Sequence, residues 1–143
     1  MSAGTMSPSA PSRRTLHLTL WVAQVLLAAA FAVIGFTKLT QPMATLDAQF
    51  PWLASAPATL VRCIGMAELA GAVELVLPPN ARIRPRVAPL AALGLAVIMA
   101  LATAFHLSRG DDSALPITAV LGLLAVCVAW GRGKTAPVTP RDH

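Results

Sequence analysis

Residues 59–78 carry the charged side chains that most need an explanation. The stretch is long and apolar enough to cross a bilayer, yet it contains Arg62, Glu68 and Glu74. An ionised side chain at the centre of a membrane helix costs roughly 2.5 to 3.5 kcal/mol, whereas each Leu, Ile or Val returns only about 0.3 to 0.6 kcal/mol. Glu68 is therefore expected to face protein or trapped water, where an intramembrane carboxylate is a candidate functional group.

A partner for Glu68 has to come from another helix. Glu68 follows Arg62 by six residues. This spacing places their side chains about 120° apart around a helix, so they should not pair with each other. Candidates for the partner are Thr37, Lys38, Thr103 and His106. We take Glu68, Arg62, His106 and Lys38 as the candidate ligand-binding residues, and the sequence assigns no catalytic residue.

Each of these residues also has a structural interpretation. Arg62 and Lys38 lie near predicted helix ends, where long cationic side chains reach the lipid headgroups. His106 has no second histidine or carboxylate at ligand spacing on its own helix, so no metal site is predicted and a local hydrogen bond is the alternative. Glu68 is either a functional carboxylate or a protonated structural group.

The composition predicts one small integral membrane domain. Hydrophobic residues make up 56% and charged residues only 12% of the chain, and the mean hydropathy is +0.68. Soluble proteins average about 25% charged residues. A chain of 143 residues has room for four spans of about 20 residues with short connections, and a separate catalytic domain does not fit.

Four apolar runs define the expected organisation. We predict a disordered leader over residues 1–14, a transmembrane domain over 15–131 and a basic tail over 132–143. The spans are expected at 16–38, 59–77, 87–107 and 114–130, which makes the fold class all-α, an integral membrane four-helix bundle. Residues 40–58 are too polar and too rich in proline to span, so they are expected to lie at the membrane interface.

Small and polar residues predict details of the last two spans. Alanines at positions 88, 92, 96, 100 and 104 repeat every fourth residue, which predicts a seam where helix backbones approach closely. Asp111, Asp112 and Ser113 precede the fourth span and are predicted to cap it, with Pro116 in its first turn.

Basic residues predict the orientation of the chain. Eight of them fall in the leader, the loop between the second and third spans, and the tail. Lys38 and Arg109 fall on the opposite side, and Arg62 lies just inside the second span. The positive-inside rule therefore places both termini in the cytoplasm and the protein in the cell membrane. The net charge of +5 is interpreted as contact with lipid headgroups, and no nucleic-acid partner is predicted.

The sequence lacks the motifs of the common redox cofactors. Cys63 and Cys127 are expected at membrane depths that differ by more than the ~7 Å allowed between the Cα atoms of a disulfide. There is no Cys-x-x-Cys motif, no glycine pattern for nucleotides and no paired histidines for haem. We therefore expect no intrinsic cofactor.

Three short motifs resemble landmarks of the DoxX and DoxX-like family. They are Gly35-Phe36-Thr37-Lys38-Leu39 followed by Pro42, then Gly65-Met66-Ala67-Glu68-Leu69, and then His106-Leu107-Ser108-Arg109-Gly110-Asp111. The resemblance covers residues 16–130. It implies a four-helix membrane bundle, and the family name comes from a subunit of an archaeal thiosulfate:quinone oxidoreductase. Other members are linked to redox and sulfur stress, and most have no established activity, so the resemblance singles out Lys38, Glu68 and His106 without assigning a reaction.

Two classes of function remain open from the sequence. In the first, the protein is a partner-dependent membrane subunit linked to redox, sulfur or quinone metabolism, with Glu68, Arg62 and His106 lining an outward-facing pocket for a quinone or a small sulfur species. In the second, it is a non-enzymatic membrane module that binds a lipid, a small solute or a partner protein. The absence of a redox-active group in the sequence favours a partner-dependent or binding role over a stand-alone enzyme.

Overall fold

The computed structural model describes residues 13–81 and 87–135. Its elements in chain order are α1 (Arg13–Thr40), α2 (Met43–Gln49), the 3-10 helix η1 (Pro51–Ser55), α3 (Ala58–Ala81), α4 (Val87–Arg109), α5 (Leu115–Trp130) and the π-helix η2 (Gly131–Thr135). The described residues form helices and turns, without a strand. The predicted all-α class is confirmed, and the four long helices lie close to the four predicted segments.

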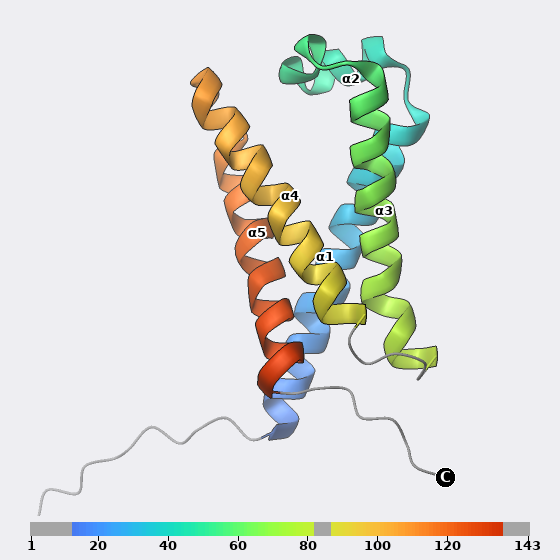
Figure 1. The fold of residues 1–143 in the computed structure, drawn as a ribbon, viewed down its shortest axis with the longest axis vertical. Coiled ribbons are helices and arrows are strands. Elements are labelled where there is room, and N and C mark those ends of the chain that lie inside the picture. The colour runs from blue at the N-terminus through green and yellow to red at the C-terminus, as the bar shows by residue number, and fades with distance from the viewer. Residues whose placement is uncertain (1–12, 82–86, 136–143) are drawn as a thin grey trace, which may run out of the picture.

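The four long helices run alternately in opposite directions (Figure 1). The most extensive contacts are those of α1 with α3 and of α4 with α5, while α3 also touches α4 and α1 also touches α5. The two pairs lie close together at the lower end of Figure 1 and diverge toward the upper end, where α2 lies. The beginning of α1 and the end of α5 are both at the lower end, so the described part of the chain starts and finishes on the same side.

Three helical segments are long and apolar enough, by length and composition, to cross a membrane. They are Arg13–Thr40, Val87–Arg109 and Leu115–Lys134. Helix α3 has a sufficient length of 24 residues, but it carries Arg62, Glu68 and Glu74 and is not one of these three segments. The structure thus supports a membrane protein, while the expected fourth span depends on how the charges of α3 are neutralised.

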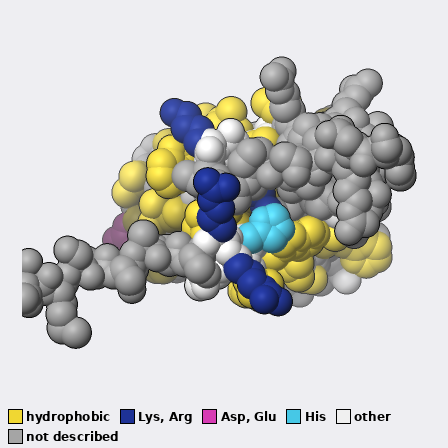
Figure 2. Space-filling view, turned by 90° about the horizontal axis from the view of Figure 1, so that it is seen from below, with side chains coloured by type: hydrophobic (Ala, Val, Ile, Leu, Met, Phe, Trp, Pro, Cys, Tyr) yellow, Lys and Arg dark blue, Asp and Glu magenta, His cyan; other side chains and the backbone are white. Residues whose placement is uncertain are grey.

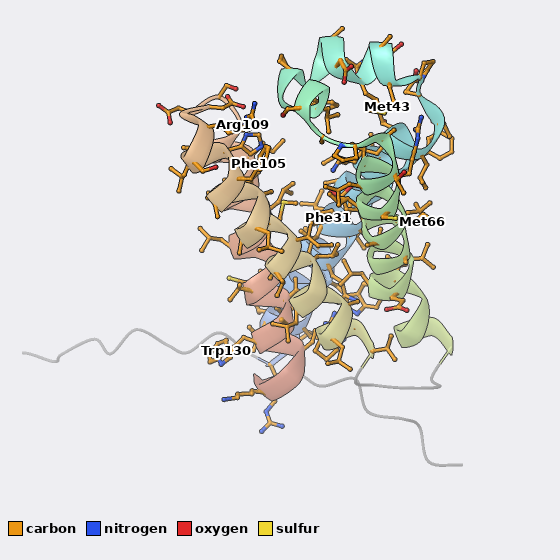
Figure 3. The ribbon with its side chains drawn as sticks, turned by 45° about the horizontal axis from the view of Figure 1, so that its top comes forward. Phe31, Met43, Met66, Phe105, Arg109 and Trp130 are labelled. Carbon is orange, nitrogen blue, oxygen red and sulfur yellow. The ribbon has the colours of Figure 1, made fainter. Side chains whose placement is uncertain are left out.

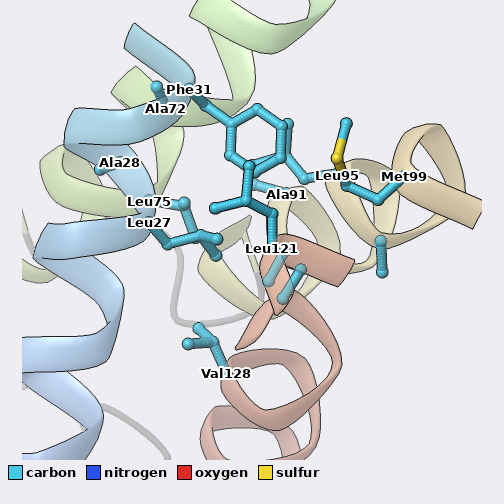
Figure 4. Packing of buried hydrophobic residues seen from close by; sticks show 13 residues of the cluster. Leu27, Ala28, Phe31, Ala72, Leu75, Ala91, Leu95, Met99, Leu121 and Val128 are labelled. Atoms are coloured by element: carbon cyan, nitrogen blue, oxygen red, sulfur yellow. The ribbon is translucent and has the colours of Figure 1, made fainter. Parts of the chain in front are cut away.

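A single apolar core holds the long helices together. Its buried side chains come from all four of them, including Leu27 and Phe31 from α1, Leu75 from α3, Leu95 from α4 and Leu121 from α5 (Figure 4). Alanines pack between these larger side chains, which lets the helices approach while the interior stays filled. The core is therefore continuous from α1 to α5.

Large apolar side chains also cover the outside of the long helices. Leu26, Val33, Leu101 and Leu123 are each more than 60% exposed. A soluble monomer rarely exposes apolar surface on this scale. A helix that is hydrophobic on its outer face as well as its inner face is typical of a membrane span, so this surface is consistent with contact to lipid.

Helices α2 and η1 form a small cap beside the end of the α1–α3 pair (Figure 1). Leu46 and Leu53 are fully buried there against Val61 of α3, with Met43 and Phe50 packed around them. Residues 40–58 thus form two helices of only seven and five residues, and their apolar side chains share one contact. Their location at the membrane interface stays a prediction.

The predicted alanine seam on α4 is correct over only part of its length. Ala88, Ala92 and Ala96 are buried, but Ala100 and Ala104 are exposed. A four-residue step advances about 400° around a helix, so a strict i+4 stripe drifts by about 40° at each step and leaves the packed face. Met99 and His106 continue that face in place of the last two alanines.

Replacing Ala96 with leucine should destabilise the packed helices. Ala96 is 8% exposed within the core, and overpacking such a site typically costs about 1 to 3 kcal/mol. The measurement is thermal unfolding of the purified protein in detergent. Ala100→Leu is the matched control on the same helix and should leave the midpoint unchanged, because its side chain is exposed. Equal midpoints for the two variants would show that this part of α4 is not tightly packed.

Candidate functional site

Helices α1 and α3 approach each other most closely at two glycines. A Cβ atom placed on Gly35 would lie 2.7 Å from the carbonyl oxygen of Gly65 and 2.9 Å from the backbone nitrogen of Leu69. One placed on Gly65 would lie 2.9 Å from Cβ of Lys38. No side chain larger than hydrogen fits at either position without moving a helix. Close approach through small residues is a common way for helices to associate in lipid.

The candidate residues Lys38 and Glu68 form an ion pair beside this contact. Nζ of Lys38 donates to Oε1 of Glu68 at 2.8 Å and to Oε2 at 2.9 Å. Glu68 is fully buried and Lys38 is 7% exposed. The structure thereby confirms that the partner of Glu68 comes from another helix, and it identifies that partner as Lys38.

The geometry of antiparallel helices explains why these two side chains meet. Side chains on a helix lean toward its N-terminus. Because α1 and α3 run in opposite directions, Lys38 leans along its helix toward Glu68 while Glu68 leans toward Lys38. The nearby glycines shorten the remaining distance between the two axes, so the ammonium and the carboxylate reach hydrogen-bonding contact.

Arg62 is connected to this pair through the backbone. Its Nη1 donates to the carbonyl oxygen of Lys38, and its Nη2 donates to the carbonyl oxygen of Gln41 at 2.8 Å. The last carbonyls of a helix lack intrahelical partners, and a cation near them is favourable. Arg62 therefore fixes the end of α1, and with it the backbone of Lys38, in agreement with the predicted lack of a direct Arg62–Glu68 pair.

The fourth candidate, His106, belongs to a second polar cluster at the turn between α4 and α5. Its Nδ1 lies 2.9 Å from Oδ2 of Asp111, and Ser113 donates its hydroxyl to Oδ1 of Asp111 at 2.6 Å. These hydrogen bonds, from Ser113 first and His106 second, hold the pKa of the Asp111 carboxyl below its usual value. Figure 3 shows the neighbouring Phe105 and Arg109 at the upper end of α4, apart from Met66 on α3.

The predicted capping of the last helix is wrong in detail. The N-cap residue of α5 is Ala114, which makes no side-chain cap hydrogen bond, although a proline does stand in the first turn. The carboxylate of Asp111 instead accepts a hydrogen bond from the Ser113 hydroxyl within the turn. The backbone N–H of Leu115 donates to the carbonyl oxygen of Asp112. The turn also contains Gly110 at φ 66°, a backbone conformation that glycine adopts without strain.

A third polar cluster, at the lower end of the helices, was not anticipated from the sequence. Nε of Arg132 in η2 donates to Oε1 of Gln24 on α1 at 2.8 Å, and Nε2 of Gln24 donates to the carbonyl oxygen of Leu75 on α3. Arg132 is 2% exposed and Gln24 is fully buried. The lone polar Gln24 within an apolar run was the available sequence signal for this cluster, whereas Arg132 had been counted with the basic tail.

The remaining candidate chemistry is limited. Cys63 and Cys127 are both exposed, and neither forms a disulfide. Their different predicted depths led us to expect that they do not pair with each other. Within residues 13–81 and 87–135, His, Cys, Asp and Glu side chains form no group of three that could hold a metal ion.

The positions of the two glycines suggest what the first two sequence motifs do. In each motif a glycine precedes the charged residue by three positions, as Gly35 precedes Lys38 and Gly65 precedes Glu68. Residues three apart lie on the same face of a helix. Each motif therefore supplies one half of the same contact, a small residue for close approach and a charged residue for the ion pair. This spacing could have identified the Lys38–Glu68 pair from the sequence.

Replacing Gly35 with alanine should separate α1 from α3 and weaken the ion pair. The added Cβ would meet backbone atoms, which cannot rotate away, so we expect a loss of about 1 to 3 kcal/mol, as for overpacking. Thermal unfolding in detergent measures this loss. Gly94→Ala is the matched control, since its Cβ would meet no atom within 4 Å, and a helical alanine is favoured over glycine by about 1 kcal/mol. A Gly35→Ala protein as stable as Gly94→Ala would show that this contact is looser than described.

Comparison with known proteins places the chain in a family. The model of the DoxX-like family matches residues 22–128, a range that includes both glycines, the Lys38–Glu68 pair, Arg62, His106 and Gln24. Comparisons with curated proteins and with solved structures give no match. The matched range covers most of the chain and includes at least the greater part of each of the four long helices, so the chain belongs to the DoxX-like family.

Proposed function

We propose that the protein is a four-helix bundle of the cell membrane, a partner-dependent subunit linked to redox, sulfur or quinone metabolism, with the Lys38–Glu68 pair as its ligand-binding centre. The observation that supports this proposal is the buried pair itself, in which one ammonium donates to both oxygens of one carboxylate. Arg62 positions the pair through the backbone of Lys38. His106 belongs to the separate polar cluster at the turn between α4 and α5.

Neutralisation of Glu68 lowers the free-energy cost of placing α3 in the membrane, and so supports α3 as the fourth span. The charge that most opposes insertion is paired with Lys38 inside the protein, and Arg62 lies near the beginning of α3, where it bonds to carbonyl oxygens. Charged residues within membranes are found paired with one another or with backbone carbonyls. With these two charges satisfied, Glu74 is the remaining charged side chain of α3 and is exposed. In this proposal α3 crosses the bilayer beside α1.

The chemistry of the pair suits a ligand that accepts hydrogen bonds. A lysine ammonium has three donors, and Glu68 occupies two of them. The third donor is available to a carbonyl oxygen, such as that of a quinone, or to an oxygen of a small sulfur species. The carboxylate can take up or release a proton as the ligand changes its charge. In this proposal a partner protein supplies the electrons, because Lys38 and Glu68 offer protons and hydrogen bonds only.

An apolar surface groove is compatible with the alternative, a non-enzymatic module that binds lipid. A groove of about 520 Å³ lies between α1 and α3 and is lined by Val25, Ala28, Ala29, Ala32, Ala72, Val73 and Val76. Its lining is almost entirely apolar, which matches an acyl chain or the isoprenoid tail of a quinone. The groove by itself therefore supports ligand binding of either kind, and the ionic pair distinguishes the first proposal from the second.

Replacing both members of the ion pair separates its structural role from its function. Glu68→Leu and Lys38→Met each leave one charge buried without its partner, which typically costs about 3 to 5 kcal/mol. The double variant should recover most of this stability, because an apolar pair of similar size can replace a buried ion pair. Thermal unfolding in detergent measures stability, and quinone retained on the purified protein together with redox-stress tolerance of the host measures function.

We expect the double variant to fold but to lose quinone retention and stress tolerance. Glu74→Leu is the matched control, since Glu74 is an exposed glutamate on the same helix, and it should leave both properties unchanged. A double variant with normal stability, quinone content and stress tolerance would remove the pair from the site. Retention of lipid but never quinone by the unmodified protein would favour the lipid-binding alternative.

The proposed orientation places the lower end of Figure 1 in the cytoplasm. Single cysteines introduced by Gln49→Cys in α2 and Gly133→Cys in η2, in a background lacking Cys63 and Cys127, report on the two ends, since both positions are exposed. In intact cells an impermeant thiol reagent should label position 49 and spare position 133, because the basic residues favour the cytoplasmic side. Labelling of position 133 but not of position 49 would show that the orientation is inverted. Labelling of both positions would contradict an even number of spans.

A further inference from the structure

Arg132 is a buried cation at the lower end of the helices, and its guanidinium group is only partly satisfied. Nε bonds to Gln24, and Nη1 lies 3.3 Å from Nδ1 of His17. The plane of the group lies near the Trp21 ring, with Cζ 5.3 Å from the ring centroid. Nη2 is buried and has no hydrogen-bond partner. A buried donor without an acceptor is costly, so this nitrogen calls for a ligand or another explanation.

No described carboxylate neutralises Arg132. The ion pairs among residues 13–81 and 87–135 join Lys38 to Glu68 and His106 to Asp111. Gln24 and the Trp21 ring are uncharged groups, and arginine cannot lose its proton at ordinary pH. Among the described residues, the partners of the positively charged Arg132 are therefore neutral. An uncompensated buried charge is expensive, which favours an anion at this position.

An anion could contact Arg132 through Nη1 and Nη2, because Nε is already bonded to Gln24. Arginine has donors only, so Nδ1 of His17 must be the acceptor in their contact. His17 is exposed, and its contact with Nη1 is long. An oxyanion that displaced the imidazole would reach Nη1 and the unpaired Nη2 together. Two parallel donors at this spacing match two oxygens of one phosphate group.

The surroundings of Arg132 also favour a negative ligand. Arg13 and Arg14 at the start of α1 and Lys134 in η2 are exposed on the same end of the molecule. Figure 2 shows Lys and Arg side chains gathered around a histidine on this face. Trp130, 61% exposed, lies at the end of α5, and exposed tryptophans are typical of the level of the lipid headgroups.

We propose that Arg132 binds an oxyanion of the phosphate class through Nη1 and Nη2, with His17 as the side chain that the anion displaces and Gln24 as the group that orients the guanidinium. The oxyanion is either the phosphate of a phospholipid headgroup or free phosphate. This site is separate from the Lys38–Glu68 pair and lies at the opposite end of the long helices. It holds η2, α1 and α3 together through one ligand-bearing arginine.

Fluorescence of Trp21 tests this proposal directly, because its ring lies beside the guanidinium. The purified, delipidated full chain carries Trp52→Phe and Trp130→Phe, so that Trp21 is the only emitter. It is titrated in detergent with phosphatidylglycerol, with a glycolipid that lacks phosphate, or with inorganic phosphate. We expect saturable changes with phosphatidylglycerol and none with the glycolipid. Saturation by inorganic phosphate at micromolar concentration would identify free phosphate as the ligand instead.

Three variants separate a specific site from general attraction. Lys134→Gln removes one exposed cation two residues away and should weaken binding at most about fivefold, the contribution of one basic residue near an anionic surface. Arg132→Gln removes the same charge together with both donors and should weaken binding at least about 100-fold, as two charge-assisted hydrogen bonds imply. His17→Ala frees Nη1 and should leave binding equal to or tighter than that of the unmodified protein.

The outcomes decide the proposal even if Arg132→Gln fails to fold. In that case Arg132→Lys, which keeps the charge but lacks the two-nitrogen edge, should bind at least about tenfold more weakly than the unmodified protein. Equal losses for Arg132→Gln and Lys134→Gln would show only general electrostatic attraction and overturn the site. Loss of binding in His17→Ala would assign the ligand to His17 and likewise overturn it, as would a response to the phosphate-free glycolipid.

Discussion

The structure depends on the neutralisation of charges inside the protein, where water cannot solvate them. Glu68 is fully buried, and both of its oxygens are bonded to Lys38 of the neighbouring helix. The pair forms because two glycines let α1 and α3 approach until the side chains meet. Association of these two helices and burial of Glu68 are therefore one event in energetic terms, since neither charge is tolerable inside the protein without the other.

Other polar contacts in the protein also join separate helices. Arg62 satisfies the last carbonyls of α1, and Gln24 bridges Arg132 and the carbonyl oxygen of Leu75. Between α4 and α5, the hydroxyls of Thr103 and Thr118 are 3.0 Å apart. Each contact joins different helices and supplies a specific register to an interface that is otherwise made of alanine, leucine and valine.

Much of the fold could be predicted from the sequence, because apolar runs of the right length leave few alternatives. The pairing of Lys38 with Glu68 was one of four options, and the glycine three positions before each residue would have selected it. The alanine repeat on α4 misled the prediction beyond Ala96, because an i+4 repeat does not stay on one face of a helix. The lone polar Gln24 in an apolar run indicated a buried polar contact, but the sequence did not identify its partner, because Arg132 lies 108 positions away among the basic residues of the tail.

The ion pair between α1 and α3 has a consequence for the order in which the chain enters the membrane. The separation between Lys38 and Glu68 is 30 residues, so at synthesis rates of about 5 to 20 residues per second the lysine waits a few seconds for its partner. During that interval α3 is absent and cannot neutralise the end of α1. In the proposed four-span topology, the first helix must therefore either stay beside the insertion machinery or keep its lysine at the water boundary, and the two helices would become fully embedded only as a hairpin.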